Sequence, residues 1–329
     1  MTEQQPNGTI EALTPRENRY RDINDKLRQA LPVTPVHAAV IGIITTFILF
    51  YFVGSILQVL LFGMKIGEID YSLKLLQVGQ QILFILLPAL FLSFAFYRDV
   101  TEVIRFRWPD IREYLLYLPA VILLSILLNY FLAFQDAMLE VMVGSEGWLR
   151  DTKNSLDAFN DQLQAVYADF VGARNPFEMA FALLVAAMTP AICEEVMFRG
   201  YFFKSLELRF KPAIAIFISG LVFSLYHFNP YGFLPITGMG IFLAYAVYRS
   251  NSIGVSVFIH FLYNGIAILL YNLLSGTALE KQLESPEGEP LQLLPILLAA
   301  SVLFAVSVYF IERFYKLQQK GEESHGSMS

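Results

Sequence analysis

The sequence has few charged residues and almost no cysteine. Only 16% of its 329 residues are Asp, Glu, Lys or Arg, well below the roughly 25% typical of soluble domains. Cys193 is the only cysteine, which excludes a disulfide framework and a cluster of thiolate metal ligands. The low charge means that lipid must cover much of the surface, and it leaves no basic patch for nucleic acid.

Long apolar runs stand where charge is missing. The chain is 56% hydrophobic and 15% aromatic, and several runs reach the ~20 residues needed to cross a bilayer. We predict an all-α polytopic membrane helix bundle of about eight transmembrane helices, forming one domain over residues 34–312 within membrane lipids. The predicted spans are 34–61, 73–96, 114–134, 177–193, 212–228, 233–248, 253–272 and 293–312.

The two ends of the chain differ from this domain in composition. Residues 1–33 form a polar tail that is too long and too acidic for a signal peptide, so we expect the first span to stay as an anchor. Residues 313–329 are charged and are predicted to be disordered. With eight spans, 17 of the 23 basic residues fall on one side, which predicts that both termini are cytoplasmic.

The segment 136–176 lies between two predicted spans and has its own periodicity. Its apolar residues recur at helical spacing opposite acidic residues, which predicts an amphipathic helix. This helix either lies on the membrane surface or caps the bundle. The apolar positions are Leu156, Phe159, Leu163, Val166, Tyr167 and Phe170.

Polar residues inside the spans are the strongest functional signal. Each ionisable side chain costs about 2.5–3.5 kcal/mol to insert, so such residues usually face a partner or a water-filled cavity. Here they fall into three groups with one shared spacing, i and i+4, which places two residues on one helix face. The pairs are Glu195 with Arg199, Phe223 with His227, and His260 with Asn264.

Two adjacent carboxylates can then have different roles. Glu195 can form an intrahelical ion pair with Arg199, whereas Glu194 points about 100° away and is free to face another group. We therefore assign Glu195 as a structural partner and Glu194 as a reactive base. The alternative is a purely structural role, in which the ion pair only holds helices together and the histidines only pack in the core.

Whether the three groups lie at the same depth in the membrane depends on where the helix that carries Glu194 begins. Thr189-Pro190 has the pattern of an N-cap followed by proline at the first helical position. A kinked helix from 190 to about 209 would bring Glu194 to a depth similar to those of His227 and His260.

The motifs EExxxR, FxxxH and HxxxN on successive helices resemble the CPBP family of CAAX proteases and bacteriocin-processing enzymes, over roughly residues 177–272. The resemblance implies an intramembrane endopeptidase that acts on a peptide or lipidated protein. Glu194 and His227 would activate a water molecule. His260 and Asn264 would bind the oxyanion or hold the catalytic centre, beside the Glu195–Arg199 pair.

Other intramembrane proteases match less well, since no HExxH or GxGD motif is present and Gly254-Val255-Ser256-Val257 lacks the second glycine of GxSG. The resemblance leaves two mechanisms open. Glu194, His227 and His260 could supply three ligands to a divalent metal such as Zn²⁺, or the glutamate could act without a metal.

Two other functions fit parts of the pattern. A non-catalytic bacteriocin-immunity or scaffold protein could keep the fold and bind a peptide without cutting it. A proton-coupled transporter could also bury Glu, His and Arg, but no internal repeat symmetry supports this.

Overall fold

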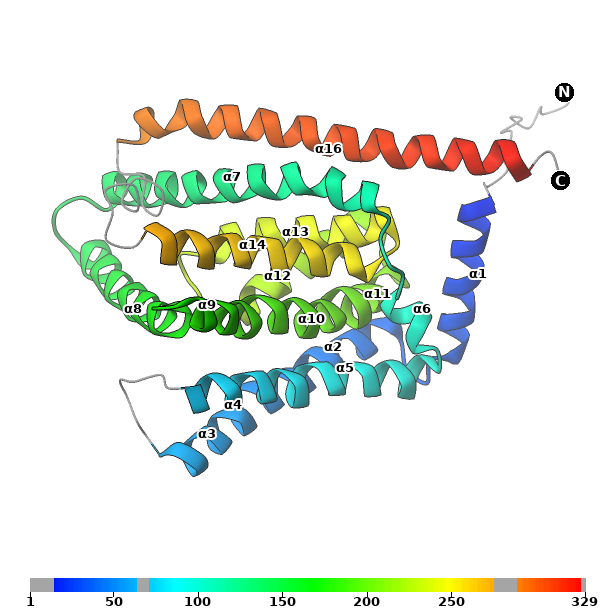
Figure 1. Ribbon diagram of the computed structural model, residues 1–329, viewed down its shortest axis with the longest axis horizontal. Coiled ribbons are helices and arrows are strands. Elements are labelled where there is room, and N and C mark those ends of the chain that lie inside the picture. The colour runs from blue at the N-terminus through cyan, green and yellow to red at the C-terminus, as the bar shows by residue number, and fades with distance from the viewer. Residues whose placement is uncertain (1–14, 64–70, 275–288, 327–329) are drawn as a thin grey trace, which may run out of the picture.

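The computed structural model describes residues 15–63, 71–274 and 289–326, and none of these residues lies in a β-strand. The chain forms a bundle of long helical rods that run roughly side by side (Figure 1). Several rods contain short π-helical turns, labelled η, between α-helical segments. The predicted all-α, polytopic membrane bundle is confirmed.

The rods follow one another along the chain. The first rod consists of α2 (Pro35–Phe47), η1 (Ile48–Val53) and α3 (Gly54–Phe62). The second consists of α4 (Tyr71–Gln81), η2 (Ile82–Leu86), α5 (Leu87–Leu92) and η3 (Ser93–Tyr97). Next come α6 (Val100–Ile104), α7 (Ile111–Val143) and α8 (Trp148–Val171), then α9 (Pro176–Leu183), η4 (Leu184–Met188), α10 (Thr189–Glu195), η5 (Val196–Phe202) and α11 (Phe203–Glu207). The last are α12 (Pro212–Tyr226), α13 (Phe233–Ser250), α14 (Ile253–Leu274) and α16 (Pro290–Gly326).

Six helices in the described residues are long and apolar enough to cross a membrane. They are Pro35–Phe62, Tyr71–Tyr97, Ile111–Val143, Pro176–Glu207, Ile253–Leu274 and Pro290–Gly321. The remaining two predicted spans correspond to α12, an apolar helix of only 15 residues, and α13, of 18 residues. The predicted number of eight spans is therefore not confirmed, although a helix lies at each predicted place.

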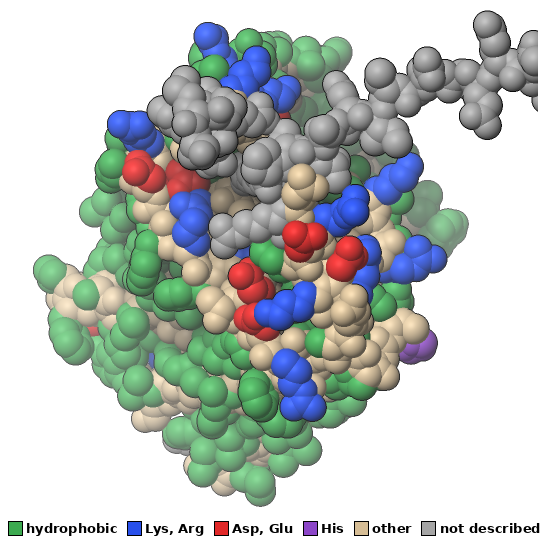
Figure 2. Space-filling model, turned by 90° about the vertical axis from the view of Figure 1, so that its right-hand side faces the viewer, with side chains coloured by type: hydrophobic (Ala, Val, Ile, Leu, Met, Phe, Trp, Pro, Cys, Tyr) green, Lys and Arg blue, Asp and Glu red, His purple; other side chains and the backbone are tan. Residues whose placement is uncertain are grey.

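Both described ends of the chain lie at the same end of the bundle, where α1 (Pro15–Ala30) and the end of α16 are found (Figure 1). Figure 2 looks onto this end and shows Lys, Arg, Asp and Glu side chains gathered there. A cytoplasmic location for this end stays a prediction. The predicted disorder of 313–329 is wrong for 313–326, since α16 continues to Gly326; residues 327–329 lie outside the described residues.

Helix α1 falls in the predicted polar tail, yet it packs against the end of α11. The Tyr20 hydroxyl donates to Glu207 Oε1 at 2.7 Å, and the buried Lys204 ammonium donates to Asn24 Oδ1 at 2.6 Å. Helix α1 is thus held by hydrogen bonds to the same rod that carries the motif glutamates. Residues 1–14 of the tail lie outside the described residues.

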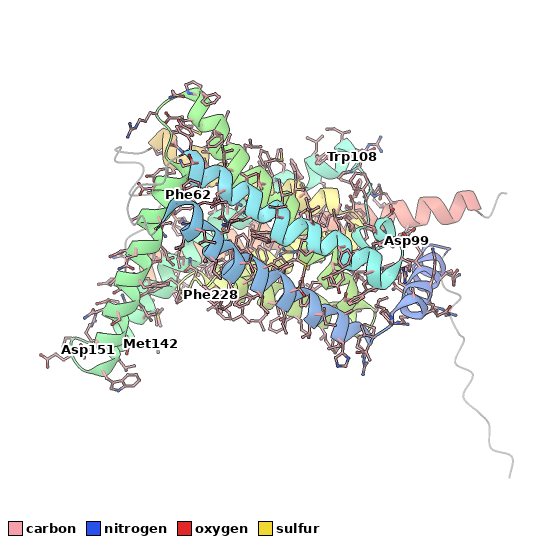
Figure 3. All side chains as sticks on the ribbon, turned by 90° about the horizontal axis from the view of Figure 1, so that it is seen from below. Phe62, Asp99, Trp108, Met142, Asp151 and Phe228 are labelled. Carbon is pink, nitrogen blue, oxygen red and sulfur yellow. The ribbon has the colours of Figure 1, made fainter. Side chains whose placement is uncertain are left out.

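Helix α8 confirms the predicted helix between two spans. It crosses the bundle at the end opposite α1, and the α7–α8 corner with Met142 and Asp151 projects beyond the rods (Figure 3). Its apolar side chains Leu149, Phe159 and Val166 are exposed, whereas Lys153 is buried against the bundle. Contact of this apolar face with lipid stays a prediction.

Helices α12 and α13 form a close hairpin because glycines meet between them. A Cβ atom on Gly240 would lie 2.8 Å from Gly220 Cα, and a Cβ on Gly220 would lie 2.7 Å from the backbone nitrogen of Ile241. Neither position has room for a side chain. The Gly240 carbonyl of this hairpin also accepts a hydrogen bond from Arg199 of the motif helix.

The rod that carries Glu194 and Glu195 differs from its prediction. It is one continuous helix from Pro176 to Glu207, so Thr189 is not an N-cap and no helix begins at 190. The Thr189 hydroxyl instead donates back to the Leu184 carbonyl at 2.8 Å. The predicted span end at 193 was likewise wrong, and both glutamates lie well inside a helix.

Candidate active site

The centre of the site is a fully buried ion pair. Arg199 Nη1 donates to Glu195 Oε1 at 2.9 Å, and both side chains are 0% exposed. Arg199 Nη2 donates to the Gly240 carbonyl at 3.2 Å, and its guanidinium lies 4.0 Å from the Phe223 ring centroid. The predicted intrahelical pair is confirmed, and the charge of Arg199 is shared among a carboxylate, a carbonyl and an aromatic face.

His260 joins this pair from α14. Its Nδ1 lies 2.9 Å from Glu195 Oε1, and its side chain is 6% exposed. A carboxylate oxygen only accepts, so Nδ1 carries the proton and donates to Glu195. The carboxylate thereby fixes the orientation of the imidazole and leaves Nε2 for another partner.

Glu194 and His227 form a second, more accessible pair. Glu194 Oε2 lies 3.9 Å from His227 Nε2, with side chains 15% and 33% exposed. His227 Nδ1 lies 2.7 Å from the Phe223 carbonyl oxygen and donates to it, which leaves Nε2 as an acceptor in the neutral ring. Glu194 Oε2 is buried and has no hydrogen-bond partner among the described residues. The two adjacent glutamates thus face different neighbours, as predicted.

Phe223 packs against both imidazoles. Its ring centroid is 4.5 Å from that of His227 and 5.9 Å from that of His260, edge-on in both cases. The motif phenylalanine therefore connects the three groups: its ring contacts Arg199 and both histidines, and its carbonyl orients His227.

An aromatic wall borders the accessible pair, and the sequence analysis missed it. Tyr51 of η1 donates to the Tyr226 carbonyl and packs against Phe228, with ring centroids 5.2 Å apart. Phe47 of α2 lies 5.8 Å from Phe228, a residue that is 54% exposed and is labelled in Figure 3. Aromatic residues are common throughout the first span, so no spacing marked these positions.

Asn264 lies one turn beyond His260 but faces elsewhere. Its Nδ2 donates to the Ala186 carbonyl at 3.3 Å. No hydrogen bond joins it to Glu194, His227 or His260 in the described part of the chain. The structure therefore gathers five of the six predicted site residues and places Asn264 at the edge.

The predicted metal ligands do not meet as one group. Within residues 15–63, 71–274 and 289–326, no three His, Cys, Asp or Glu side chains are placed to hold a metal ion. The Nδ1 atom of His260 is directed at Glu195, whereas His227 lies near Glu194. Glu194, His227 and His260 thus do not fit a three-ligand zinc centre in this arrangement.

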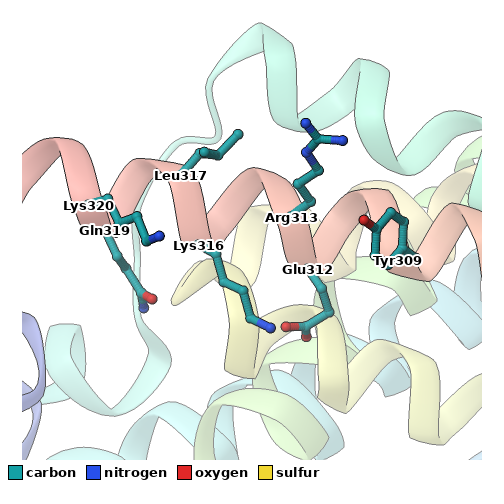
Figure 4. A pocket seen from close by; sticks show the side chains of 7 residues that line it. All are labelled: Tyr309, Glu312, Arg313, Lys316, Leu317, Gln319 and Lys320. Atoms are coloured by element: carbon teal, nitrogen blue, oxygen red, sulfur yellow. The ribbon is translucent and has the colours of Figure 1, made fainter.

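A surface hollow on α16 does not belong to this site. It is lined by Tyr309, Glu312, Arg313, Lys316, Leu317, Gln319 and Lys320. The close view shows Arg313 and Leu317 pointing to the opposite side of α16 from Glu312 and Lys316 (Figure 4). Glu312 is occupied by Tyr245 and Arg249, so the hollow offers no convergent set of groups.

Comparison with protein families agrees with the motifs. Residues 176–266 match the family described as Type II CAAX prenyl endopeptidase Rce1-like. The matched region contains Glu194, Glu195, Arg199, His227, His260 and Asn264, so the resemblance inferred from the motifs is confirmed there. No curated protein matches the chain.

Proposed function

Because residues 176–266 match the family described as Type II CAAX prenyl endopeptidase Rce1-like, we propose that the protein is an intramembrane endopeptidase in which Glu194 and His227 activate a water molecule. The accessible Glu194–His227 pair is the observation that carries this proposal. Its separation of 3.9 Å is too long for a direct hydrogen bond. It suits a water molecule held by both groups.

The chemistry of this pair is sufficient for hydrolysis. Water transfers a proton to the Glu194 carboxylate as its oxygen bonds to the peptide carbonyl carbon. The carbon–nitrogen bond then breaks, and the nitrogen takes up that proton. His227 Nε2, an acceptor in the neutral ring, orients the water and shares its proton.

The buried group of Arg199, Glu195 and His260 would stabilise the charge that develops on the carbonyl oxygen. His260 contacts Glu195 through Nδ1, which leaves its Nε2 atom for another partner. The fixed positive charge of this group is the guanidinium of Arg199. A fixed positive group in a water-poor cavity stabilises an oxyanion better than bulk water does.

The aromatic wall supports a membrane-associated peptide as the substrate class. Phe228 follows His227 directly in the chain, and its ring packs with those of Phe47 and Tyr51 to form an apolar surface. Such a surface can hold an apolar or lipidated segment while the adjacent peptide bond reaches Glu194. A CAAX-type prenylated peptide is the substrate to test first, followed by small membrane peptides.

The test is cleavage by purified wild type and Glu194→Gln of a farnesylated CAAX peptide and of a small peptide library. We expect Glu194→Gln to lower kcat about 10²- to 10⁴-fold, as loss of a general base does. Glu146→Gln, at an exposed position in the turn before α8, is the matched control and should cleave like wild type. Cleavage by Glu194→Gln at the wild-type rate would refute the assignment.

Two further arms distinguish the alternatives. Chelation should leave cleavage intact, because the described residues hold no three-ligand group; loss that Zn²⁺ restores would instead establish a metal enzyme. A non-catalytic binding protein would bind peptides with equal affinity as wild type and as Glu194→Gln, and cleave none. Solute flux into proteoliposomes would identify a transporter.

A further inference from the structure

The turn that follows His227 has an unusual backbone. His227 ends α12, and residues 228–232 lead into α13. Phe228 has φ +49°, in the left-handed region that a bulky side chain rarely adopts. Such a conformation persists only when neighbouring contacts hold it.

Phe228 itself packs against Phe47 and Tyr51, and the other end of the turn is held by α7 and α8. The Tyr231 hydroxyl donates to Asp157 Oδ1 of α8, and the Tyr231 carbonyl accepts from Gln135 Nε2 of α7 at 3.1 Å. The Tyr231 side chain is buried. Within the turn itself, the Gly232 amide donates to Asn229 Oδ1 at 2.8 Å. Tyr231 is thus the residue by which the His227 turn is tied to the helix across the bundle end.

Lys153 holds the Asp157 carboxylate, which accepts the hydrogen bond from Tyr231. Its ammonium lies 3.0 Å from Asp157, 3.3 Å from Asp136 and 3.3 Å from Glu140, and its side chain is only 9% exposed. It also lies 5.9 Å from the Tyr231 ring centroid. The cluster therefore clamps α8 to α7 and holds the Asp157 carboxylate opposite the Tyr231 hydroxyl.

This polar cluster does more than dock α8. An amphipathic helix normally buries its apolar side, yet α8 buries Lys153, keeps Asp157 half-buried beside it and leaves Leu156 and Phe159 exposed. These polar groups contact Tyr231, which lies four residues after His227. Ion pairs that only anchored α8 to α7 would not need a hydrogen bond to that turn.

We propose that Tyr231 and Asp157, backed by Lys153, are positioning residues that hold the His227 turn so that His227 faces Glu194. The catalytic meaning of this tie rests on the proposed function. The effect of this tie on the position of His227 can be measured without any substrate. Cutting it releases the turn at Phe228 and lets the His227 ring move away from Glu194.

The first experiment measures the reactivity of His227 with diethyl pyrocarbonate, located by mass spectrometry, in full-length wild type and Tyr231→Phe. This change removes the hydroxyl and keeps the ring. We expect the rate at His227 to rise at least about threefold, as loss of a hydrogen bond to a charged group allows. His37 provides an internal reference rate, and Tyr309→Phe, at an exposed tyrosine on α16, is the matched control.

A second variant keeps the test decisive if Tyr231→Phe does not fold. Asp157→Asn removes the charge that pairs with Lys153 and retains an acceptor oxygen, so it should raise the His227 rate less than Asp157→Leu. An unchanged His227 rate in folded Tyr231→Phe, with only a lower melting temperature, would overturn the proposal and leave a purely structural cluster.

Cleavage assays then separate this proposal from the proposed function. If wild type cleaves a peptide, Tyr231→Phe should lower kcat and leave KM unchanged, because the substrate surface is untouched. If wild type cleaves nothing while the His227 rate responds to Tyr231→Phe, the tie stands and the endopeptidase proposal fails.

Discussion

The side-chain amide of Asn264 donates to the carbonyl oxygen of Ala186 at 3.3 Å. Ala186 lies four residues before Pro190, and proline has no N–H to donate to that carbonyl. Backbone groups inside a membrane must be satisfied within the protein. Asn264 therefore adds a side-chain hydrogen bond to the rod that carries Glu194, within the π-helical turn η4 and one turn before its proline.

This relationship predicts coupling between Asn264 and Pro190. Asn264→Ala should cost about 1 kcal/mol of unfolding free energy, because it removes a part-buried hydrogen bond. Pro190→Ala restores an N–H, so the same Asn264→Ala change should cost less in that background. The measurement is denaturant or thermal unfolding of the four proteins in detergent. Equal costs in both backgrounds, together with a large loss of kcat, would instead indicate a direct role of Asn264 in catalysis.

The buried Glu195–Arg199 pair predicts strong non-additivity. Glu195→Gln or Arg199→Met alone leaves one charge unpaired at a fully buried position, which costs about 3–5 kcal/mol. The double variant removes both charges and should cost less than the sum. Lys26→Met is the control, because the exposed Lys26–Asp99 pair should contribute less than about 1 kcal/mol. If the double variant lost as much unfolding free energy as the two single variants together, Glu195 and Arg199 would not stabilise each other.

The sequence was most informative where interactions are local along a helix. The i, i+4 spacing located the Glu195–Arg199 pair, because that geometry is a property of the helix alone. The separate directions of Glu194 and Glu195 followed from the same period. Apolar runs of spanning length likewise placed the rods, since a bilayer sets their length.

The missed features depend on distant segments. Asn264 meets Ala186 across 78 residues, and Tyr231 meets Asp157 across 74; neither pair has a spacing that a sequence reveals. The supposed helix start at Pro190 failed for a related reason. Neighbouring polar groups supply the hydrogen bonds that a proline interrupts, so a membrane helix can continue through it.

Acid should weaken the contact between α8 and the His227 turn. Burial raises the pKa of Asp157, but the hydrogen bond from Tyr231 and the ion pair with Lys153 outweigh it and hold the pKa below its usual 3.8. A lowered folded-state pKa contributes stability above the unfolded pKa, and this contribution is lost as the pH falls through the folded value. The melting-temperature difference between wild type and Asp157→Asn should therefore be constant above about pH 4.5 and shrink below it.

Asp161→Asn, at an exposed position on the same helix, controls for the general effect of acid on α8. It should melt like wild type at every pH. A difference for Asp157→Asn that grows as the pH falls would have the wrong sign for a carboxylate stabilised in its charged form.

The exposed apolar face of α8 predicts that this helix lies in the lipid headgroup region. Trp148 at its start is 74% exposed, and Leu149, Phe159 and Val166 are exposed along its length. Tryptophan and an amphipathic helix both favour the membrane–water interface. Since the chain has two tryptophans, Trp108→Phe leaves Trp148 as the sole reporter. In liposomes, lipids brominated near the carbonyl should quench its fluorescence more than lipids brominated at the chain end. Strong quenching by aqueous acrylamide with none from either lipid would place α8 in water, as a cap of the bundle alone.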